Sequence, residues 1–174
     1  MEKFELFNEH GQALNKTATR HDTLQSDEYF RVVHVWIKNS NHEFLIQQRN
    51  KKEDPMPYQW ATTTGIPFIN ESLKEAALRE VKEELGLVFH QDSLIELKTI
   101  TTKDERYHTI TTVYLIQEDI DLKKVKVFKN EVKNVAYASL NRIQTMIEKE
   151  SFWDYSKLLK DKNYFTYLKK GRDQ

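Results

Sequence analysis

The chain has 174 residues, enough to bury one substantial core, and we expect a single domain over residues 1–174. Its 27 basic and 27 acidic residues cancel, so no global field draws the protein to a long nucleic acid or to a membrane. The absence of cysteine excludes disulfides, thiolate metal sites and cysteine nucleophiles. The N-terminus is charged and no apolar run approaches a membrane span, so we expect a cytoplasmic protein.

Segments rich in β-branched and aromatic residues recur along the chain and predict strands. Residues 28–38 and 43–49 flank a polar turn at 39–42, which predicts a hairpin. Residues 61–65 are also strand-like. Later strands are predicted at 94–102, 108–117 and 132–138, the first two of these joined by a charged turn.

A helix is predicted between these strands, from Leu73 to Leu85. Ser72 and Glu75 have the spacing of a capping box at its start, and Gly86 supplies a stop at its end. Leu73, Ala77 and Val81 form an apolar stripe at helical spacing.

Helices are also predicted in the C-terminal part of the chain. One runs from residue 140 to about 149, and the aromatic residues after 150 indicate one or two more, packed rather than functional. Strands in the middle with helices before and after the last strand predict an α/β fold with a mixed sheet and helices on both faces.

Three glutamates stand close together on the predicted helix. Glu80, Glu83 and Glu84 are spaced i, i+3 and i+4, so their carboxylates share one face. Like charges at this spacing destabilise a helix that has no counter-ion, whereas Mg²⁺ and Mn²⁺ take oxygen ligands of this kind. Taken alone, the pattern also fits an ordinary solvated acidic face.

A much longer pattern surrounds these glutamates. Gly65 is followed by five residues, Glu71, seven residues and then the run 79–87, Arg-Glu-Val-Lys-Glu-Glu-Leu-Gly-Leu. It resembles the Nudix box at every fixed position, in the loop–helix–turn context that the motif requires. The detailed resemblance covers residues 65–87 and implies the α/β/α sandwich of that family. It also implies metal-dependent hydrolysis of a nucleoside diphosphate derivative or a related organic diphosphate.

The resemblance assigns roles by position. Glu80, Glu83 and Glu84 are expected to hold Mg²⁺ or Mn²⁺, with the Gly65 carbonyl as a further ligand. Glu71 and Arg79 are expected to support this site, with Arg79 orienting a glutamate ligand and pairing with Glu71. An ordinary surface pair is the alternative for the last two residues. The implied chemistry is attack of a metal-activated water on phosphorus.

Other residues are weaker candidates. Glu131, just ahead of the last strand, is a candidate general base or extra ligand, or a solvated strand-start residue. Trp60 is a candidate to stack on a substrate, with core packing as the alternative. His34 lies within an apolar strand and receives no role. A small basic cluster could meet phosphate oxygens or be a solvated loop: Arg49, Lys51 and Lys52.

Two other functions remain open. The segments 32–37 and 44–49 also resemble the isopentenyl-diphosphate isomerase branch of the same fold, but those enzymes use a cysteine that this chain lacks. A non-catalytic module that senses a nucleotide is the third hypothesis. The motif does not identify the leaving group, so nucleotides, nucleotide sugars, dinucleoside polyphosphates and prenyl diphosphates are all candidate substrates. The aromatic C-terminal segment is a candidate homodimer surface.

Overall fold

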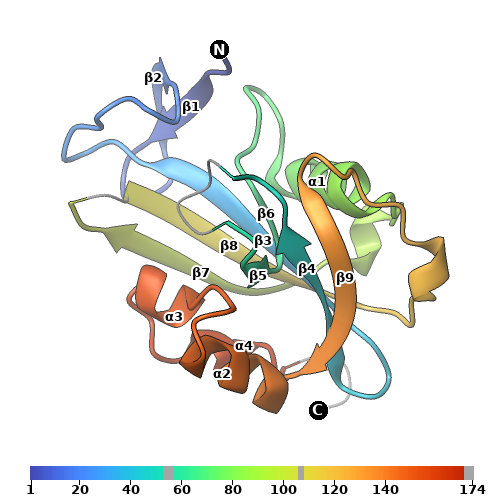
Figure 1. Cartoon of the computed structure of the whole chain (residues 1–174). Coiled ribbons are helices and arrows are strands. Elements are labelled where there is room, and N and C mark those ends of the chain that lie inside the picture. Colours follow the sequence, from blue (N-terminus) through green and yellow to red (C-terminus); the bar gives the residue numbers. More distant parts are fainter. Residues whose placement is uncertain (53–56, 106–107, 171–174) are drawn as a thin grey trace.

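The computed structural model describes residues 1–52, 57–105 and 108–170, and a mixed sheet forms its centre (Figure 1). The strand order is β5-β4-β3-β8-β7, with β6 also paired to β3 and β9 to β4. Strands β3 (Phe30–Lys38) and β8 (His108–Gln117) run parallel over their whole length, and the other pairs are antiparallel. The remaining strands are β4 (Glu43–Arg49), β5 (Trp60–Ala61), β6 (Thr63–Gly65), β7 (Ile95–Lys103) and β9 (Val132–Ser139).

Helix α1 (Leu73–Leu85) covers one face of this sheet, and its predicted bounds are confirmed. Alternate residues of β3, among them Val33 and Val35, belong to the same buried cluster as Val81 of the helix. Both hydrogen bonds of the predicted capping box form between Ser72 and Glu75. Gly86 ends the helix with φ of 66°, a left-handed conformation that glycine adopts without strain.

The C-terminal helices cover the opposite face of the sheet (Figure 1). They are α2 (Leu140–Glu148), α3 (Tyr155–Leu158) and α4 (Tyr164–Tyr167). Trp36 of β3 is fully buried among the rings of Phe44, Phe152 and Tyr164 beneath them. The predicted α/β/α sandwich with a mixed sheet is therefore confirmed. Short 3₁₀ turns occur at Gln91–Ser93 and Leu122–Lys124.

The predicted hairpin of residues 28–38 and 43–49 forms only at its turn. Strands β3 and β4 pair at Lys38 and Phe44 and then diverge. β3 instead lies between β6 and β8, while β4 pairs with β9 and β5. These partners lie farther along the chain, and a local turn pattern carries no information about them.

An N-terminal hairpin that the sequence pattern did not predict lies beside one end of the main sheet (Figure 1). It consists of β1 (Phe4–Phe7) and β2 (Ala13–Ala18). Phe4 and Leu6 are buried with Phe30, the first residue of β3, in a cluster of their own. Within the described ranges, no helix is long and apolar enough to cross a membrane.

Candidate active site

Helix α1 brings Glu80 directly against Gly65, the last residue of β6. A Cβ atom at position 65 would overlap the Glu80 carboxyl group, so only glycine allows this approach. Glu84, one helical turn later, is partly buried, whereas the Glu83 side chain is 53% exposed. The three glutamates therefore differ in exposure: Glu80 lies against the sheet, Glu84 is partly buried and Glu83 faces solvent.

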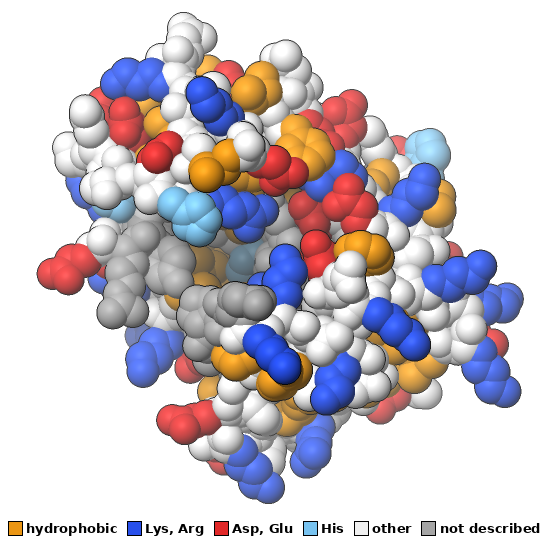
Figure 2. All heavy atoms as spheres, turned by 45° about the horizontal axis from the view of Figure 1, so that its top comes forward, with side chains coloured by type: hydrophobic (Ala, Val, Ile, Leu, Met, Phe, Trp, Pro, Cys, Tyr) orange, Lys and Arg blue, Asp and Glu red, His pale blue; other side chains and the backbone are white. Residues whose placement is uncertain are grey.

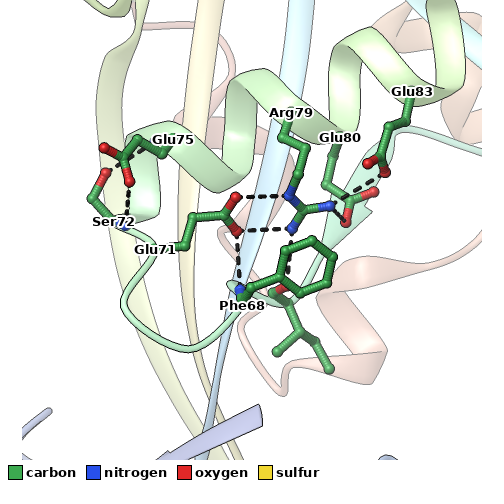
Figure 3. A network of polar contacts seen from close by, with 8 residues as sticks. Phe68, Glu71, Ser72, Glu75, Arg79, Glu80 and Glu83 are labelled. Atoms are coloured by element: carbon green, nitrogen blue, oxygen red, sulfur yellow. Dashed lines mark hydrogen bonds and ion pairs between the residues drawn. The ribbon is translucent and has the colours of Figure 1, made fainter. Parts of the chain in front are cut away.

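Arg79 links these glutamates to the loop before the helix (Figure 3). Its Nε and Nη2 donate to the two oxygens of Glu71 at 2.7 and 2.9 Å, a bidentate pair. Its Nη1 donates to Glu80 at 2.9 Å and to Glu83 at 3.2 Å. The structure thus brings Arg79 and Glu71 together as the motif implies. Both side chains are mostly buried, with 15% of Glu71 and 18% of Arg79 accessible.

Phe68 covers the Arg79 guanidinium (Figure 3). The guanidinium carbon lies 3.7 Å from the centre of the Phe68 ring, and the Phe68 amide donates to Glu71 at 2.9 Å. Phe4 of the N-terminal hairpin stacks on Phe68 with a centroid separation of 6.4 Å and an interplanar angle of 12°. The motif does not specify an aromatic residue at position 68, so no role was predicted for Phe68 from the sequence.

Gln47 of β4 orients Glu84. Its Nε2 donates to the Glu84 carboxylate at 2.9 Å, and its Oε1 accepts from the Thr63 hydroxyl at 3.1 Å. Because Thr63 engages the carbonyl end, the amide end of Gln47 is directed at Glu84. Gln47 is only 5% exposed. No role was predicted for Gln47, which directly follows the apolar run of residues 44–46 in the sequence.

The environment of the glutamates favours their protonated forms. Burial, reinforced by the neighbouring charge of Glu80, raises the pKa of Glu84 to about 8. Burial also raises the pKa of Glu80 to about 7, against the opposing effect of Arg79. Negative charge at these two positions is therefore only partly compensated by the protein.

These residues fit a hard divalent cation. The donors are all oxygen atoms, and a cation would supply the compensation that Glu80 and Glu84 lack. Within residues 1–52, 57–105 and 108–170, no three acidic, histidine or cysteine side chains already stand as a ready metal site. Arg79 instead holds Glu80 and Glu83, so a cation would have to share or displace these contacts.

The glutamates open onto a cleft of about 920 Å³. Figure 2 shows this hollow, with acidic side chains crowded on one side of it and basic side chains beside them. Its basic lining residues include Arg20, Arg49 and Lys51. Leu158, Leu159 and Trp153 line the part under the C-terminal helices, with the Arg49 guanidinium 5.3 Å from the Trp153 ring. One cleft thus joins the carboxylates to a partly aromatic wall.

The weaker sequence candidates are placed as follows. Glu131 lies on the cleft, ion-paired with Lys51 at 3.7 Å and near enough to Glu84 to help raise its pKa. Trp60 packs against the core under the C-terminal helices and is not among the residues that line the described cleft. His34, which received no role, does line the cleft.

Comparison with known proteins identifies relatives over most of the chain. The NUDIX domain model matches residues 28–160. An uncharacterised Nudix hydrolase from Listeria innocua is 30% identical over 159 residues, covering 89% of this chain and 90% of that protein. An ADP-ribose pyrophosphatase from Methanocaldococcus jannaschii is 27% identical, covering 72% and 68%. The weaker isomerase resemblance also appears, with an isopentenyl-diphosphate delta-isomerase of Aspergillus fumigatus at 26% identity, 78% and 58% coverage.

Solved structures share the fold. A Deinococcus radiodurans protein superposes with a TM-score of 0.72 at 19% identity, covering 91% of this chain and 98% of its own. A bifunctional NMN adenylyltransferase/ADP-ribose pyrophosphatase from Francisella tularensis, complexed with AMP and a manganese ion, has a TM-score of 0.61 at 21% identity. It covers 80% of this chain and 42% of its own.

Proposed function

Given that this chain belongs to the Nudix family and is a Nudix-type pyrophosphohydrolase, we propose that it cleaves a nucleoside diphosphate derivative or a related organic diphosphate. Mg²⁺ or Mn²⁺ is the proposed cofactor. Glu80, Glu83 and Glu84 would hold it, with the Gly65 carbonyl as a further ligand. When bound, such a cation neutralises phosphate charge and lowers the pKa of a water molecule.

One observation carries this proposal: two partly buried carboxylates with raised pKa values face a cleft that is large enough for a nucleotide. Glu80 and Glu84 line that cleft together with Arg20, Arg49 and Lys51. An organic diphosphate carries negative charge that can lie between a cation at the glutamates and these basic side chains. Neither the carboxylates nor the basic residues alone would bind it as well.

The protein's own side chains have distinct parts in this proposal. Arg79 holds Glu80 and Glu83 at defined positions through its contacts with Glu71, and Gln47 does the same for Glu84. Glu131, on the same cleft, is the candidate for a general base or an extra ligand. The test for Glu131 is Glu131→Gln, which should slow hydrolysis and leave the fold unchanged.

The cleft lining favours a polar organic group over a prenyl chain. Charged and polar side chains make up most of the lining, among them Arg20, Arg49 and Lys51. A prenyl chain would take such groups out of water without offering them hydrogen bonds, whereas a nucleoside offers them. Isomerase chemistry is disfavoured further because the chain has no cysteine.

The experiment is a panel of diphosphates with MgCl₂, scored by the organic products released. It should include ADP-ribose, nucleoside di- and triphosphates, a dinucleoside polyphosphate and isopentenyl diphosphate. We expect cleavage of at least one nucleotide, and strong loss of that activity in Glu83→Gln and Glu84→Gln, which keep side-chain shape and remove charge.

A matched variant controls for the loss of any glutamate. Glu148→Gln makes the same change at an exposed position of α2 that does not line the cleft. It should retain wild-type turnover. Wild-type turnover in Glu83→Gln and Glu84→Gln as well would show that these residues are ordinary surface charge.

A further inference from the structure

A buried hydrogen-bonded group connects the C-terminal helices to the floor of the cleft. The Tyr164 hydroxyl accepts from the indole N–H of Trp36 at 2.9 Å and lies 2.6 Å from Nδ1 of His34. Tyr164 and Trp36 are fully buried, and His34 is 3% exposed. The three residues come from α4 and β3, so the contact depends on the C-terminal segment packing over the sheet.

This arrangement determines which nitrogen of His34 carries the proton. An indole N–H can only donate, so the Tyr164 oxygen is an acceptor toward Trp36. The single Tyr164 proton must then reach an acceptor, and Nδ1 of His34 is the one within hydrogen-bond distance. The opposite assignment would leave a fully buried hydroxyl proton without an acceptor among the described residues. Nδ1 is therefore the acceptor and Nε2 carries the hydrogen.

The remaining N–H of His34 is available to the cleft. His34 lines the cleft, whereas Tyr164, which engages Nδ1, does not. Nε2 makes no hydrogen bond within the described part of the chain, and it is not among the fully enclosed unpaired atoms there. Burial lowers the pKa of His34 to about 3, so the ring stays neutral and keeps one donor at Nε2. A histidine that only filled the core would be expected to have both nitrogens satisfied or enclosed.

The surroundings of His34 indicate what this donor meets. In the β3–β8 register, Thr111 is paired with Val32, two residues before His34, and its hydroxyl is fully buried. The hydroxyls of Thr111 and Thr109, both on the cleft, have no partner among the described residues. The Tyr155 ring packs on His34 with a centroid separation of 4.7 Å and holds the imidazole in place. The floor therefore offers the Nε2–H of His34 as one fixed donor.

We propose that His34 is a specificity-determining residue whose Nε2–H donates to an acceptor on the organic group of the substrate. The ligand class is a planar heteroaromatic group that presents a hydrogen-bond acceptor at its edge, as a nucleobase does. This inference rests on the proposed function for the position of the diphosphate, which the acidic end of the cleft holds. The assignment of the His34 tautomer does not depend on the proposed function.

The first test is spectroscopic. In ¹⁵N-edited NMR of the imidazole ring, His34 should give the signature of a neutral Nε2–H tautomer. The four nucleoside 5′-monophosphates AMP, GMP, CMP and UMP serve as probes, with MgCl₂ present. At least one should bind and shift the Nε2–H resonance. A ring protonated on Nδ1, or failure of all four probes to bind the folded protein, would overturn the proposal.

Two substitutions separate binding from packing. The amide nitrogen of glutamine can take the place of Nε2, whereas asparagine can place its oxygen near Nδ1. His34→Gln therefore retains the donor toward the cleft and loses the contact with Tyr164, and His34→Asn does the reverse. Binding of the probe should fall about tenfold in His34→Asn and less in His34→Gln, while thermal stability should fall more in His34→Gln. Weaker binding in proportion to lost stability in both variants would show a purely structural role.

The outcomes also distinguish this inference from the proposed function. Probe binding that depends on His34, without cleavage of any diphosphate in the panel, would support the inference and contradict hydrolysis. Cleavage at wild-type rates and affinities in His34→Asn would support the proposed function and overturn the inference.

Discussion

Arg79 carries more of the site geometry than any neighbouring side chain. Its guanidinium contacts the carboxylates of Glu71, Glu80 and Glu83 and also donates to the Ile66 carbonyl at 3.3 Å. These contacts use several N–H groups of one rigid, planar cation. A lysine has the same charge but only a compact ammonium group, so it cannot make these contacts at once.

We therefore predict that Arg79→Lys lowers kcat by roughly ten- to a hundredfold, the range found when residues that support metal ligands are replaced. The loss should appear in kcat more than in KM, because Glu80 and Glu83 would still be present but poorly oriented. Steady-state kinetics on the best substrate of the panel is the measurement. Lys82→Arg, an exposed neighbour that does not line the described cleft, is the control and should be neutral.

Glu84 gives a prediction about pH. Its pKa rises to about 8 in the folded state from an ordinary value of 4.5, so the folded protein binds more protons than the unfolded chain between these values. The resulting contribution of Glu84 to the free energy of unfolding is fully present below pH 4.5 and is lost as the pH rises through 8. Glu80, with a pKa of about 7, contributes in the same direction.

In EDTA, the melting temperature should therefore fall from pH 6.5 to 8.5, and it should fall less in Glu84→Gln, which cannot ionise. This window also avoids His34, whose lowered pKa gives an opposite slope at pH values below 6.5. Thermal unfolding of both proteins across the pH series is the measurement. Parallel curves for wild type and Glu84→Gln would contradict the raised pKa.

The sequence could predict residues that belong to a contiguous motif. Glu71, Arg79 and the three glutamates lie at fixed offsets around one helix, so a single strand–loop–helix unit brings them together. Gln47, by contrast, reaches Glu84 across 37 positions in the chain, and no local pattern reveals such a contact. His34 was treated as a core residue, which describes its burial but misses its position on the cleft.

At the scale of elements, the N-terminal hairpin supports the loop that carries the motif. Phe4 of β1 stacks on Phe68, and Phe68 in turn lies on the Arg79 guanidinium. The guanidinium carbon of Arg20, just after β2, lies 5.2 Å from the centre of the Phe4 ring. The family model begins at residue 28, so this support comes from outside the matched region.

We predict that Phe4→Leu lowers the free energy of unfolding by about 1 kcal/mol through loss of its aromatic contacts, and that it also lowers kcat several-fold. The catalytic effect is expected because Phe68 loses the ring that backs it against Arg79. Phe7→Leu is the control on the same hairpin, since Phe7 packs on Arg31 rather than on Phe68. An equal fall of kcat in both variants would indicate general loss of stability instead of this stack.

Elements with local signals were predicted well, and those defined by distant partners were not. The ends of α1 follow from Ser72, Glu75 and Gly86, which act within one turn of the helix. The separation of β3 from β4 follows from pairing with β8 and β9, whose residues lie about 80–95 positions later in the chain. Hairpin β1–β2 turns through Asn8 and Gly11, but its burial depends on Phe30 of another strand, which a local pattern does not reveal.

At the scale of the whole molecule, the two faces of the sheet contribute different parts of the proposed site. Helix α1 on one face supplies the carboxylates, and the C-terminal helices on the other face supply the aromatic wall of the cleft (Figure 1). Both regions meet at the cleft, which is lined by the first half of β3 and by the last residues of β4 and β6. A cation bound at the glutamates would therefore join α1 to the sheet and stabilise the folded state as a unit.

The last prediction concerns this coupling. Added MgCl₂ should raise the melting temperature, because a ligand that binds only the folded state stabilises it by about 2.7 kcal/mol at a hundredfold excess over Kd. Glu84→Gln should lose most of this response, and Glu148→Gln, at an exposed position of α2, should keep it. Hydrolysis should likewise require Mg²⁺ or Mn²⁺ and stop when EDTA is in excess. Thermal unfolding and product release, measured on the same samples, provide the check. Full turnover in excess EDTA, together with equal MgCl₂ responses in all three proteins, would contradict a cation at these glutamates.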